Sequence, residues 1–587
     1  MNYLKRAVKW FLKTAITVFL VFLVMIFVLS AVISGLSSVQ TATPKIENGS
    51  FLVLGFPQGL SESPSKSFNI FYFSFSEMNR KQTILPDVLQ SIILASEDDR
   101  VDGILIDMDN WFISAQHTGE IHAAIDEFKK TGKKVIAFGS SLTRSNYYAA
   151  LAAERIVIDP SNSVPVYISG YGVSVPYFKK AAEKIGVRVD VIHIGKYKGA
   201  GENFASDSMS DEYRESIVKI IDEMTDIFVT EISERREFGK EEILNKINDG
   251  ELVLITPSQA LGMGVIDRTI PYDDLLAEHD LTDKKMIGIS DYIHQLKPVT
   301  AGPAVAVILA EGAIVDDSAA SRMGTEAYIT PKSIESAIKK IRKNSDIQAV
   351  VLRINSPGGS PLASEKILRK LNKLKEDMPV IVSMGPVAAS GGYYIACGSD
   401  MIFVEPNTIT GSIGVVAMIP NIGGLYEKIG IKSERITTGK YSDLFDLTKT
   451  DKSDDIAILR QSMQAVYDEF VIRVSDARDI SVSDIEMVAQ GQIWTGRQAV
   501  ENGLADAMGG LAEAVSEAAK LAGIEEYRTQ YYPENKSFSE MLLSFGEVQG
   551  AFSTVRSYGF FDNELQMLKI LSSNAGKPML LMPLLID

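Results

Sequence analysis

The chain has little of the residue types that bind metals or form disulfides. It contains one cysteine in 587 residues, Cys397, so no internal disulfide can form. No cluster of histidine, cysteine and glutamate has metal-ligand spacing, and neither a Walker A loop nor a dinucleotide-binding glycine motif follows a strand pattern. We therefore expect no metal and no cofactor, and we expect Cys397 to be a small buried apolar residue.

Positive charge is also scarce. The 59 lysines and arginines are outnumbered by 75 acidic residues, which gives a formal net charge of -16. Such a chain presents no basic field to a phosphate backbone, so nucleic acid is not an expected partner. Hydrophobic residues make up 46% of the chain and charged residues 23%, which is ordinary globular composition.

The longest uncharged run lies near the start of the chain. Four basic residues, Lys5, Arg6, Lys9 and Lys13, precede a segment without charge that extends to Pro44. Its apolar part is long enough to cross a bilayer, so we predict a cytoplasmic basic segment at 1–13 and a transmembrane signal anchor at 14–36. The positive-inside rule then places the rest of the chain on the far side, in the periplasm if the membrane is a bacterial inner membrane.

A cleaved signal peptide is the alternative interpretation of this segment. Secretory apolar cores span only about 7 to 15 residues and end at a small-residue cleavage site, and no clear site follows here. We therefore favour an uncleaved anchor. A second apolar patch at 579–585 is broken by Pro583 and is too short to span a membrane, so we expect it to be a packed or surface-lying tail.

The chain repeats itself at an offset of 246 residues, which brings Ile104 onto Val350. Residues 136–159 then align with 382–405 without a gap, and each copy reads as strand, turn, helix and strand. Because a single core stops growing near roughly 250 to 300 residues, two domains are expected in any case. Strands that alternate with helices predict βαβ units and a largely parallel sheet in each half.

The two copies differ where chemistry is expected. The second copy has Asn-Ser-Pro-Gly-Gly at 355–359 and Ala-Ser-Gly-Gly at 389–392, whereas the first copy has neither the glycines nor a serine at the equivalent of Ser390. The first copy has Lys198 where the second has Ser442. These reciprocal losses predict one composite site built from both halves.

A serine at a tight strand-to-helix turn has an exposed hydroxyl beside free backbone N–H groups, and it needs a neighbouring base to become a nucleophile. Ser390 has this setting, and the N–H groups near Gly358 and Gly359 could stabilise an oxyanion. None of the five histidines lies in the half that contains Ser390, and His193 is the rival base near Lys198. Burial would lower the pKa of Lys198 into the range of a general base.

These residues resemble the long, two-repeat form of signal peptide peptidase A, also called protease IV, of the Clp protease and crotonase superfamily. The resemblance covers nearly the whole chain. It is carried by the N-terminal anchor and by five stretches: residues 197–204, Asn355–Gly359, Gly385–Tyr394, Thr410–Gly414 and Gly491–Asp506.

The resemblance implies a serine endopeptidase in which Ser390 is the nucleophile, Lys198 the general base and Ser412 the residue that orients the lysine. It places the oxyanion hole at backbone N–H groups around Gly358, Gly359 and Gly391. It further implies degradation of signal peptides and other apolar peptides at the membrane, and a homotetramer with its sites inside.

The expected domain order follows from the repeat. We predict an N-terminal α/β repeat at 46–285, a linker at 286–303, a C-terminal α/β repeat at 304–535 and a tail at 536–587. Two other functions stay open at this point: a crotonase-like acyl-thioester enzyme, and an inactive membrane-tethered scaffold that binds peptides. Neither needs the pairing of a serine with a lysine.

Overall fold

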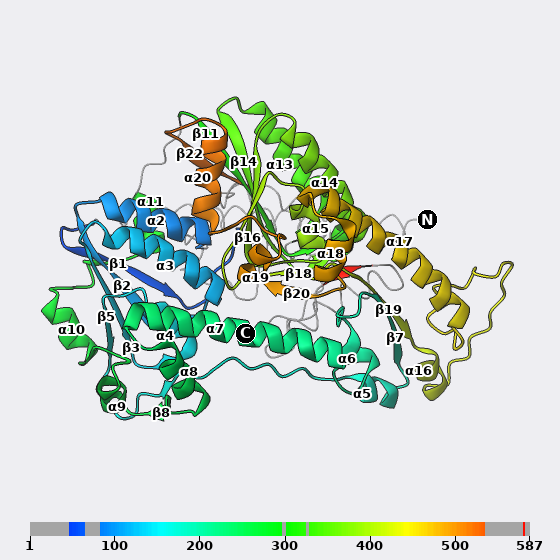
Figure 1. Cartoon of the computed structure of the whole chain (residues 1–587), viewed down its shortest axis with the longest axis horizontal. Helices are drawn as coiled ribbons and strands as arrows, with labels where there is room; N and C mark the ends of the chain where they lie inside the picture. Colours follow the sequence, from blue (N-terminus) through cyan, green and yellow to red (C-terminus); the bar gives the residue numbers. More distant parts are fainter. Residues whose placement is uncertain (1–45, 65–82, 296–300, 324–327, 534–578, 582–587) are drawn as a thin grey trace, which may run out of the picture.

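A computed structural model describes residues 46–64, 83–295, 301–323, 328–533 and 579–581. Within these ranges the chain forms two large, mainly parallel sheets flanked by helices, one from each half (Figure 1). None of the helices in these ranges is long and apolar enough to cross a membrane. The anchor predicted at 14–36 lies outside the described residues.

The N-terminal sheet has six strands, all parallel, in the order β10-β1-β2-β3-β5-β9. β10 and the helix after it lie in the range 286–303, which the sequence predicted to be a linker. Since β10 pairs with β1, the start of this range extends the N-terminal sheet. The strands are β1 (Ser50–Phe56), β2 (Val101–Trp111), β3 (Lys134–Gly139), β5 (Arg155–Ile158), β9 (Arg268–Thr269) and β10 (Met286–Gly288).

The C-terminal sheet repeats this order as β22-β11-β14-β16-β17-β21, also parallel. β18 pairs further along β16, and β20 pairs antiparallel with β18. The prediction of two α/β repeats with largely parallel sheets is therefore confirmed. The strands are β11 (Ala304–Glu311), β14 (Ile347–Ser356), β16 (Val380–Ala389), β17 (Met401–Val404), β18 (Ile409–Gly411), β20 (Ile493–Thr495), β21 (Ala507–Met508) and β22 (Arg528–Tyr532).

Helices join and cover these strands. Several begin at side-chain caps that the sequence supplies, such as Thr330 before α13 and Ser360 before α14. Those of the N-terminal half are α2 (Leu85–Glu97), α3 (Ala115–Lys129), α4 (Arg144–Ala150), α5 (Lys179–Lys184), α6 (Glu202–Ala205), α7 (Asp211–Arg236), α8 (Lys240–Asn248), α9 (Pro257–Gly262), α10 (Tyr272–Glu278) and α11 (Ile289–Gln295). Those of the C-terminal half are α12 (Asp317–Met323), α13 (Pro331–Lys343), α14 (Pro361–Lys375), α15 (Gly391–Ala396), α16 (Gly423–Lys428), α17 (Ser453–Arg478), α18 (Val482–Val488), α19 (Gly496–Glu501) and α20 (Leu511–Leu521).

One strand from the first half of the sequence pairs with a strand of the second half. β7 (Arg188–Ile194) belongs to the first half of the sequence but pairs antiparallel with β19 (Val415–Asn421) of the second, over seven residue pairs. In Figure 1 this pair lies to the right of the centre, well away from the N-terminal sheet at the left. The remaining short strands form two small sheets: β4 (Leu142–Thr143), β6 (Val166–Tyr167) and β8 (Val253–Ile255); and β12 (Ala313–Ile314), β13 (Tyr328–Ile329), β15 (Gly358–Gly359) and β23 (Leu580–Leu581).

A buried ionic cluster also joins the halves. Arg353 of β14 is fully buried, and its guanidinium donates to Glu62 at 2.7 and 3.0 Å and to Glu120 of α3. Burial by itself raises the pKa of Glu62, but the charges of Arg353 and His117 hold it down to about 2. The cluster therefore fixes the N-terminal half to the strand that leads into residues 355–359.

Candidate functional site

Ser390 lies at a strained turn between β16 and α15. Its φ is 55° and its ψ is −113°, an uncommon conformation for a residue other than glycine. The strain is held in place by the backbone, since Ser390 N–H donates to Gly411 O at 2.8 Å. The hydroxyl thus stands at the N-terminus of α15, as the sequence predicted, but the prediction that it is exposed is wrong, since the residue is fully buried.

Lys198 reaches this hydroxyl from the other half of the sequence. It follows β7, and the β7–β19 pairing carries it across to the C-terminal half. Its Nζ lies 2.8 Å from Ser390 Oγ, 2.7 Å from the carbonyl oxygen of Ser412 and 2.9 Å from Ser412 Oγ. The three residues that the sequence singled out at 198, 390 and 412 are therefore brought together within one chain.

The setting of Lys198 favours a neutral amine. The side chain is 1% exposed, and burial lowers its pKa well below the ordinary lysine value. A neutral amine has two N–H donors and one lone pair. The two oxygens of Ser412 can accept both N–H hydrogen bonds of the amine. The lone pair of the nitrogen is then free to accept a hydrogen bond from the Ser390 hydroxyl. The geometry is that of a base poised on a hydroxyl.

The glycines predicted as oxyanion donors surround the same turn. A side chain on Gly391 would come within 3.0 Å of Gly359 N and 3.2 Å of Gly358 Cα, so the start of α15 and β15 are in close contact. Gly359 has a φ of 154°, and a Cβ there would lie 1.9 Å from Ile314 O, so only glycine fits. Gly358 N–H already donates to Ser356 Oγ at 3.1 Å. The three glycines thus lie beside the Ser390 turn, and the N–H group of Gly358 is already engaged.

A segment that sequence reasoning did not single out as functional holds both Lys198 and Ser412. Tyr197 N–H donates to Gln490 O at 2.8 Å, and Ser412 N–H donates to Gln492 O at 2.7 Å. Between them, the Cα of Gly491 packs so tightly that an added Cβ would lie 2.6 Å from Lys198 N. Residues 490–492 act as a clamp. Gly491 is the first residue of Gly491–Asp506, one of the stretches that carry the family resemblance. This membership was the one indication in the sequence that the segment matters for the site.

The rival residues do not reach the serine. His193 is exposed on β7, and among the described residues the hydrogen bond to Ser390 Oγ comes from Lys198 alone. At the equivalent turn of the first copy, Arg144 stands in the place of the serine. Its guanidinium donates to Gly170 O at 2.8 Å and lies 3.9 Å from the centre of the Tyr171 ring. Of the two equivalent positions, 144 and 390, only the one in the second copy carries a serine.

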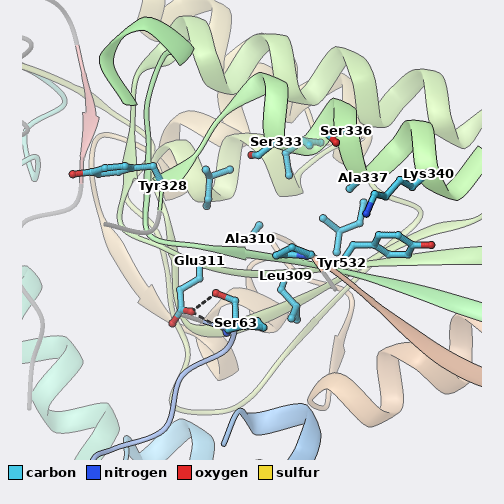
Figure 2. A pocket seen from close by; sticks show the side chains of 15 residues that line it. Ser63, Leu309, Ala310, Glu311, Tyr328, Ser333, Ser336, Ala337, Lys340 and Tyr532 are labelled. Atoms are coloured by element: carbon cyan, nitrogen blue, oxygen red, sulfur yellow. Dashed lines mark hydrogen bonds between the residues drawn. The ribbon is translucent and has the colours of Figure 1, made fainter. Parts of the chain in front are cut away.

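A separate hollow lies between β11, β13 and α13 (Figure 2). At its floor Ser63 donates to the Glu311 carboxylate through its N–H and its hydroxyl, at 2.9 and 2.7 Å. Its lining contains neither Lys198 nor Ser390 nor Ser412, so it is not the site of the serine chemistry.

Comparison with known proteins identifies a family. A model of the family described as Peptidase family S49 matches the chain twice, at residues 127–285 and 372–525. The first match contains Lys198, and the second contains Ser390 and Ser412.

Curated relatives extend over most of the chain. Protease 4 of Salmonella typhi is 31% identical and covers 80% of this chain and 77% of its own length. Protease 4 of Haemophilus influenzae is 30% identical over 89% of this chain and 88% of its own. Serine protease SPPA, chloroplastic, of Arabidopsis thaliana is 33% identical over 78% and 68%. The chain belongs to peptidase family S49, and it is a serine peptidase.

Proposed function

We propose that the chain is a membrane-anchored serine endopeptidase whose catalytic groups are Ser390 and Lys198. The observation that carries the proposal is the 2.8 Å contact between Lys198 Nζ and Ser390 Oγ in a fully buried setting. Ser412 Oγ also lies near this amine, at 2.9 Å, but Ser390 is the one that stands at the strained turn before α15, and a serine without a base is a weak nucleophile.

The reaction follows from the geometry. The neutral amine of Lys198 takes the proton of Ser390 as Oγ attacks the carbonyl carbon of the substrate peptide bond. The N–H groups of Gly359 and Gly391 stabilise the oxyanion, a contribution of about 3 to 4 kcal/mol for each donor. The ammonium then returns the proton to the leaving amine, and water, deprotonated in turn by Lys198, releases the acyl group from Ser390.

Ser412 positions the amine during this cycle. Both of its oxygens lie within 2.9 Å of Nζ, and they accept N–H bonds from the lysine in either protonation state. The ammonium gains most from these acceptors, so Ser412 also limits how far burial can depress the pKa of the lysine.

The substrates we propose are apolar peptides, signal peptides among them, met at the membrane surface. The basic segment at 1–13 and the apolar segment at 14–36 support an anchor in an inner membrane, with the catalytic halves in the periplasm. A tethered enzyme meets membrane-bound peptides at high local concentration. Assembly into a tetramer with enclosed sites would spare folded proteins.

The test is hydrolysis of a fluorogenic apolar peptide by the detergent-solubilised full-length protein, by Ser390→Ala and by Lys198→Met. We expect turnover by the wild type alone, and covalent labelling by a serine-directed phosphonate at residue 390. Turnover by Lys198→Met would exclude the lysine base, and turnover by Ser390→Ala would exclude Ser390 as the nucleophile. Recovery of the wild type in the soluble fraction without detergent would exclude the anchor.

A further inference from the structure

A carboxylate that the proposed mechanism does not use lies just after the lysine. Glu202 is the first residue of α6, four positions beyond Lys198, and its N–H donates to Gly199 O at 3.1 Å. Its carboxylate accepts two hydrogen bonds from Ser210, from the N–H at 2.5 Å and from the hydroxyl at 2.8 Å, and Tyr177 Oη lies 3.5 Å from it. Because Ser210 is the N-cap of α7, Glu202 ties the segment that carries the lysine to the start of a 26-residue helix.

An aromatic ring of the same helix packs on the residue after the lysine. The hydroxyl of Ser210 accepts a hydrogen bond from the N–H of Tyr213 at 3.3 Å, which fixes the first turn of α7. The Tyr213 ring lies so close to Gly199 that a Cβ added there would be 2.4 Å from Tyr213 Cδ2. These contacts form a closed loop that begins at Glu202 and returns to Gly199, the neighbour of Lys198.

The helix α7 is in turn fixed to the serine side of the site. Tyr213 belongs to a buried apolar cluster that includes Ala389, the residue before Ser390. Gln492, one of the residues of the clamp, donates through its side-chain amide to Ser216 Oγ of α7 at 3.1 Å. The helix therefore supports both the lysine segment and the strand that leads into the serine.

The connection from an acidic residue to the following helix is present in only one of the two repeats. The second copy has a helix of the same length, α17, but its N-cap residue makes no side-chain cap hydrogen bond. The acidic residue equivalent to Glu202 is Asp446, whose carboxylate accepts from Arg435 and from Thr448, two residues further on. The copy that kept Lys198 is thus the copy in which the acidic side chain reaches the helix.

We propose that Glu202 is a positioning residue, whose carboxylate holds the segment that carries Lys198 against α7 and so keeps the amine on Ser390 and out of water. The proposal rests on the proposed function of the Ser390 site. Glu202 acts through the backbone of residues 199–202, since its carboxylate is engaged by Ser210. Without this carboxylate the segment separates from α7, and water reaches the amine.

The direction of the pH effect distinguishes displacement of the lysine from loss of a charge. Burial is what lowers the pKa of Lys198, so opening of the segment to water raises this pKa and moves the rising limb of the pH–rate profile to higher pH. Removal of a nearby negative charge would by itself lower the pKa of a lysine and move the limb the other way. The other titratable side chains around Glu202 are those of His193, Tyr177 and Tyr213, and all three are kept in the variants below.

The experiment measures hydrolysis of the fluorogenic apolar peptide by full-length Glu202→Ala, Glu202→Gln and Glu212→Ala. Glu212 provides a matched control, because it is an exposed acidic residue in the first turn of the same helix. We expect kcat of Glu202→Ala to fall roughly tenfold at unchanged KM, with the limb at higher pH. Glu202→Gln keeps one acceptor for Ser210 and should recover part of the rate, and Glu212→Ala should match the wild type. Wild-type kcat and an unmoved limb in Glu202→Ala would overturn the proposal.

Hydrogen–deuterium exchange separates failure of this proposal from failure of the proposed function. Mass spectrometry follows a peptide that covers residues 196–206 and a reference peptide from α14. We expect Glu202→Ala to exchange several-fold faster than the wild type at 196–206 and equally in the reference. Equal exchange at 196–206 would reject the tie, even where hydrolysis by the wild type leaves the serine peptidase intact. Faster exchange in a protein whose wild type hydrolyses no peptide would reject the proposed function and keep the tie between Glu202 and the lysine segment.

Discussion

Gly491→Ala is the most informative single change that the structure suggests. Gly491 has a φ of +80°, and a Cβ placed there would lie 2.6 Å from Lys198 N and 2.7 Å from both its Cα and its Cβ. All three are atoms that cannot rotate away. The substitution therefore acts on the backbone of Lys198, the base we propose, and leaves the side chains of Ser390 and Lys198 unchanged.

The expected size of the effect follows from these distances. Ordinary contact begins at 3.4 Å, so the two segments must separate by roughly 0.7 Å. Lys198 Nζ lies 2.8 Å from Ser390 Oγ, and a displacement of this order moves the pair out of hydrogen-bonding range. Misplacing reacting groups by about 1 Å costs on the order of 10²-fold in rate. We expect a fall of that order in kcat.

The control separates this displacement from backbone strain. Gly250 has a φ of +72° with nothing within 4 Å of an added Cβ, so Gly250→Ala carries the same strain of about 1 to 2 kcal/mol without the contact. Both variants are assayed with the fluorogenic peptide, and their melting temperatures are compared. If Gly491→Ala is as active as Gly250→Ala, the clamp does not position the lysine and the reasoning fails.

Three further predictions concern the buried charges. The rate of peptide hydrolysis by the wild type should rise with pH through an apparent pKa well below that of free lysine. The reason is that burial lowers the pKa of Lys198 and only the neutral amine accepts a proton. A rising limb of the pH–rate profile at the ordinary lysine pKa would contradict this. Ser412→Ala should lose roughly five-fold in rate, for about 1 kcal/mol of hydrogen bonding, and should move that limb to still lower pH, because the ammonium loses an acceptor. Ser412→Gly should show the same loss of rate and the same shift of the pH–rate profile as Ser412→Ala. A difference between the two variants would assign the loss of rate to the backbone at residue 412 and not to the missing hydroxyl. Arg353→Met should lower the free energy of unfolding by about 3 to 5 kcal/mol, since Glu62 and Glu120 are left buried without their cation, and an unchanged denaturant midpoint would refute it.

Buried lysine has a second, thermodynamic consequence. The folded protein binds fewer protons than the unfolded chain between the lowered pKa of Lys198 and about 10.4, so its stability rises with pH across that window. Lys198→Met lacks this dependence, and comparison of the two melting curves against pH isolates it.

The internal repeat made most of the fold predictable. The offset that aligns Ile104 with Val350 also aligns β2 with β14 and β3 with β16, and the two sheets have the same strand order. The repeat also located the two catalytic candidates, because each copy had lost what the other kept. Motif spacing alone would not have chosen Lys198 over the lysines near it.

What the sequence could not supply depends on contacts between distant segments. The pairing of β7 with β19 has no local signal in the sequence, because either strand could pair within its own half. The same holds for the clamp at 490–492, whose function is to touch Lys198, and for β10, which reads as linker until β1 is beside it. The tail at 579–581 was expected to pack, and its partner strand was not predictable.

The β7–β19 pairing makes activity report on assembly. Lys198 follows a strand whose pairing partner, β19, belongs to the opposite half of the molecule. Under the proposed mechanism, separation of the two halves removes Lys198 from Ser390 and leaves the serine without its base. If the dyad is as we propose, the peptidase is active only while the two halves are docked, so a partly folded chain does not hydrolyse peptides.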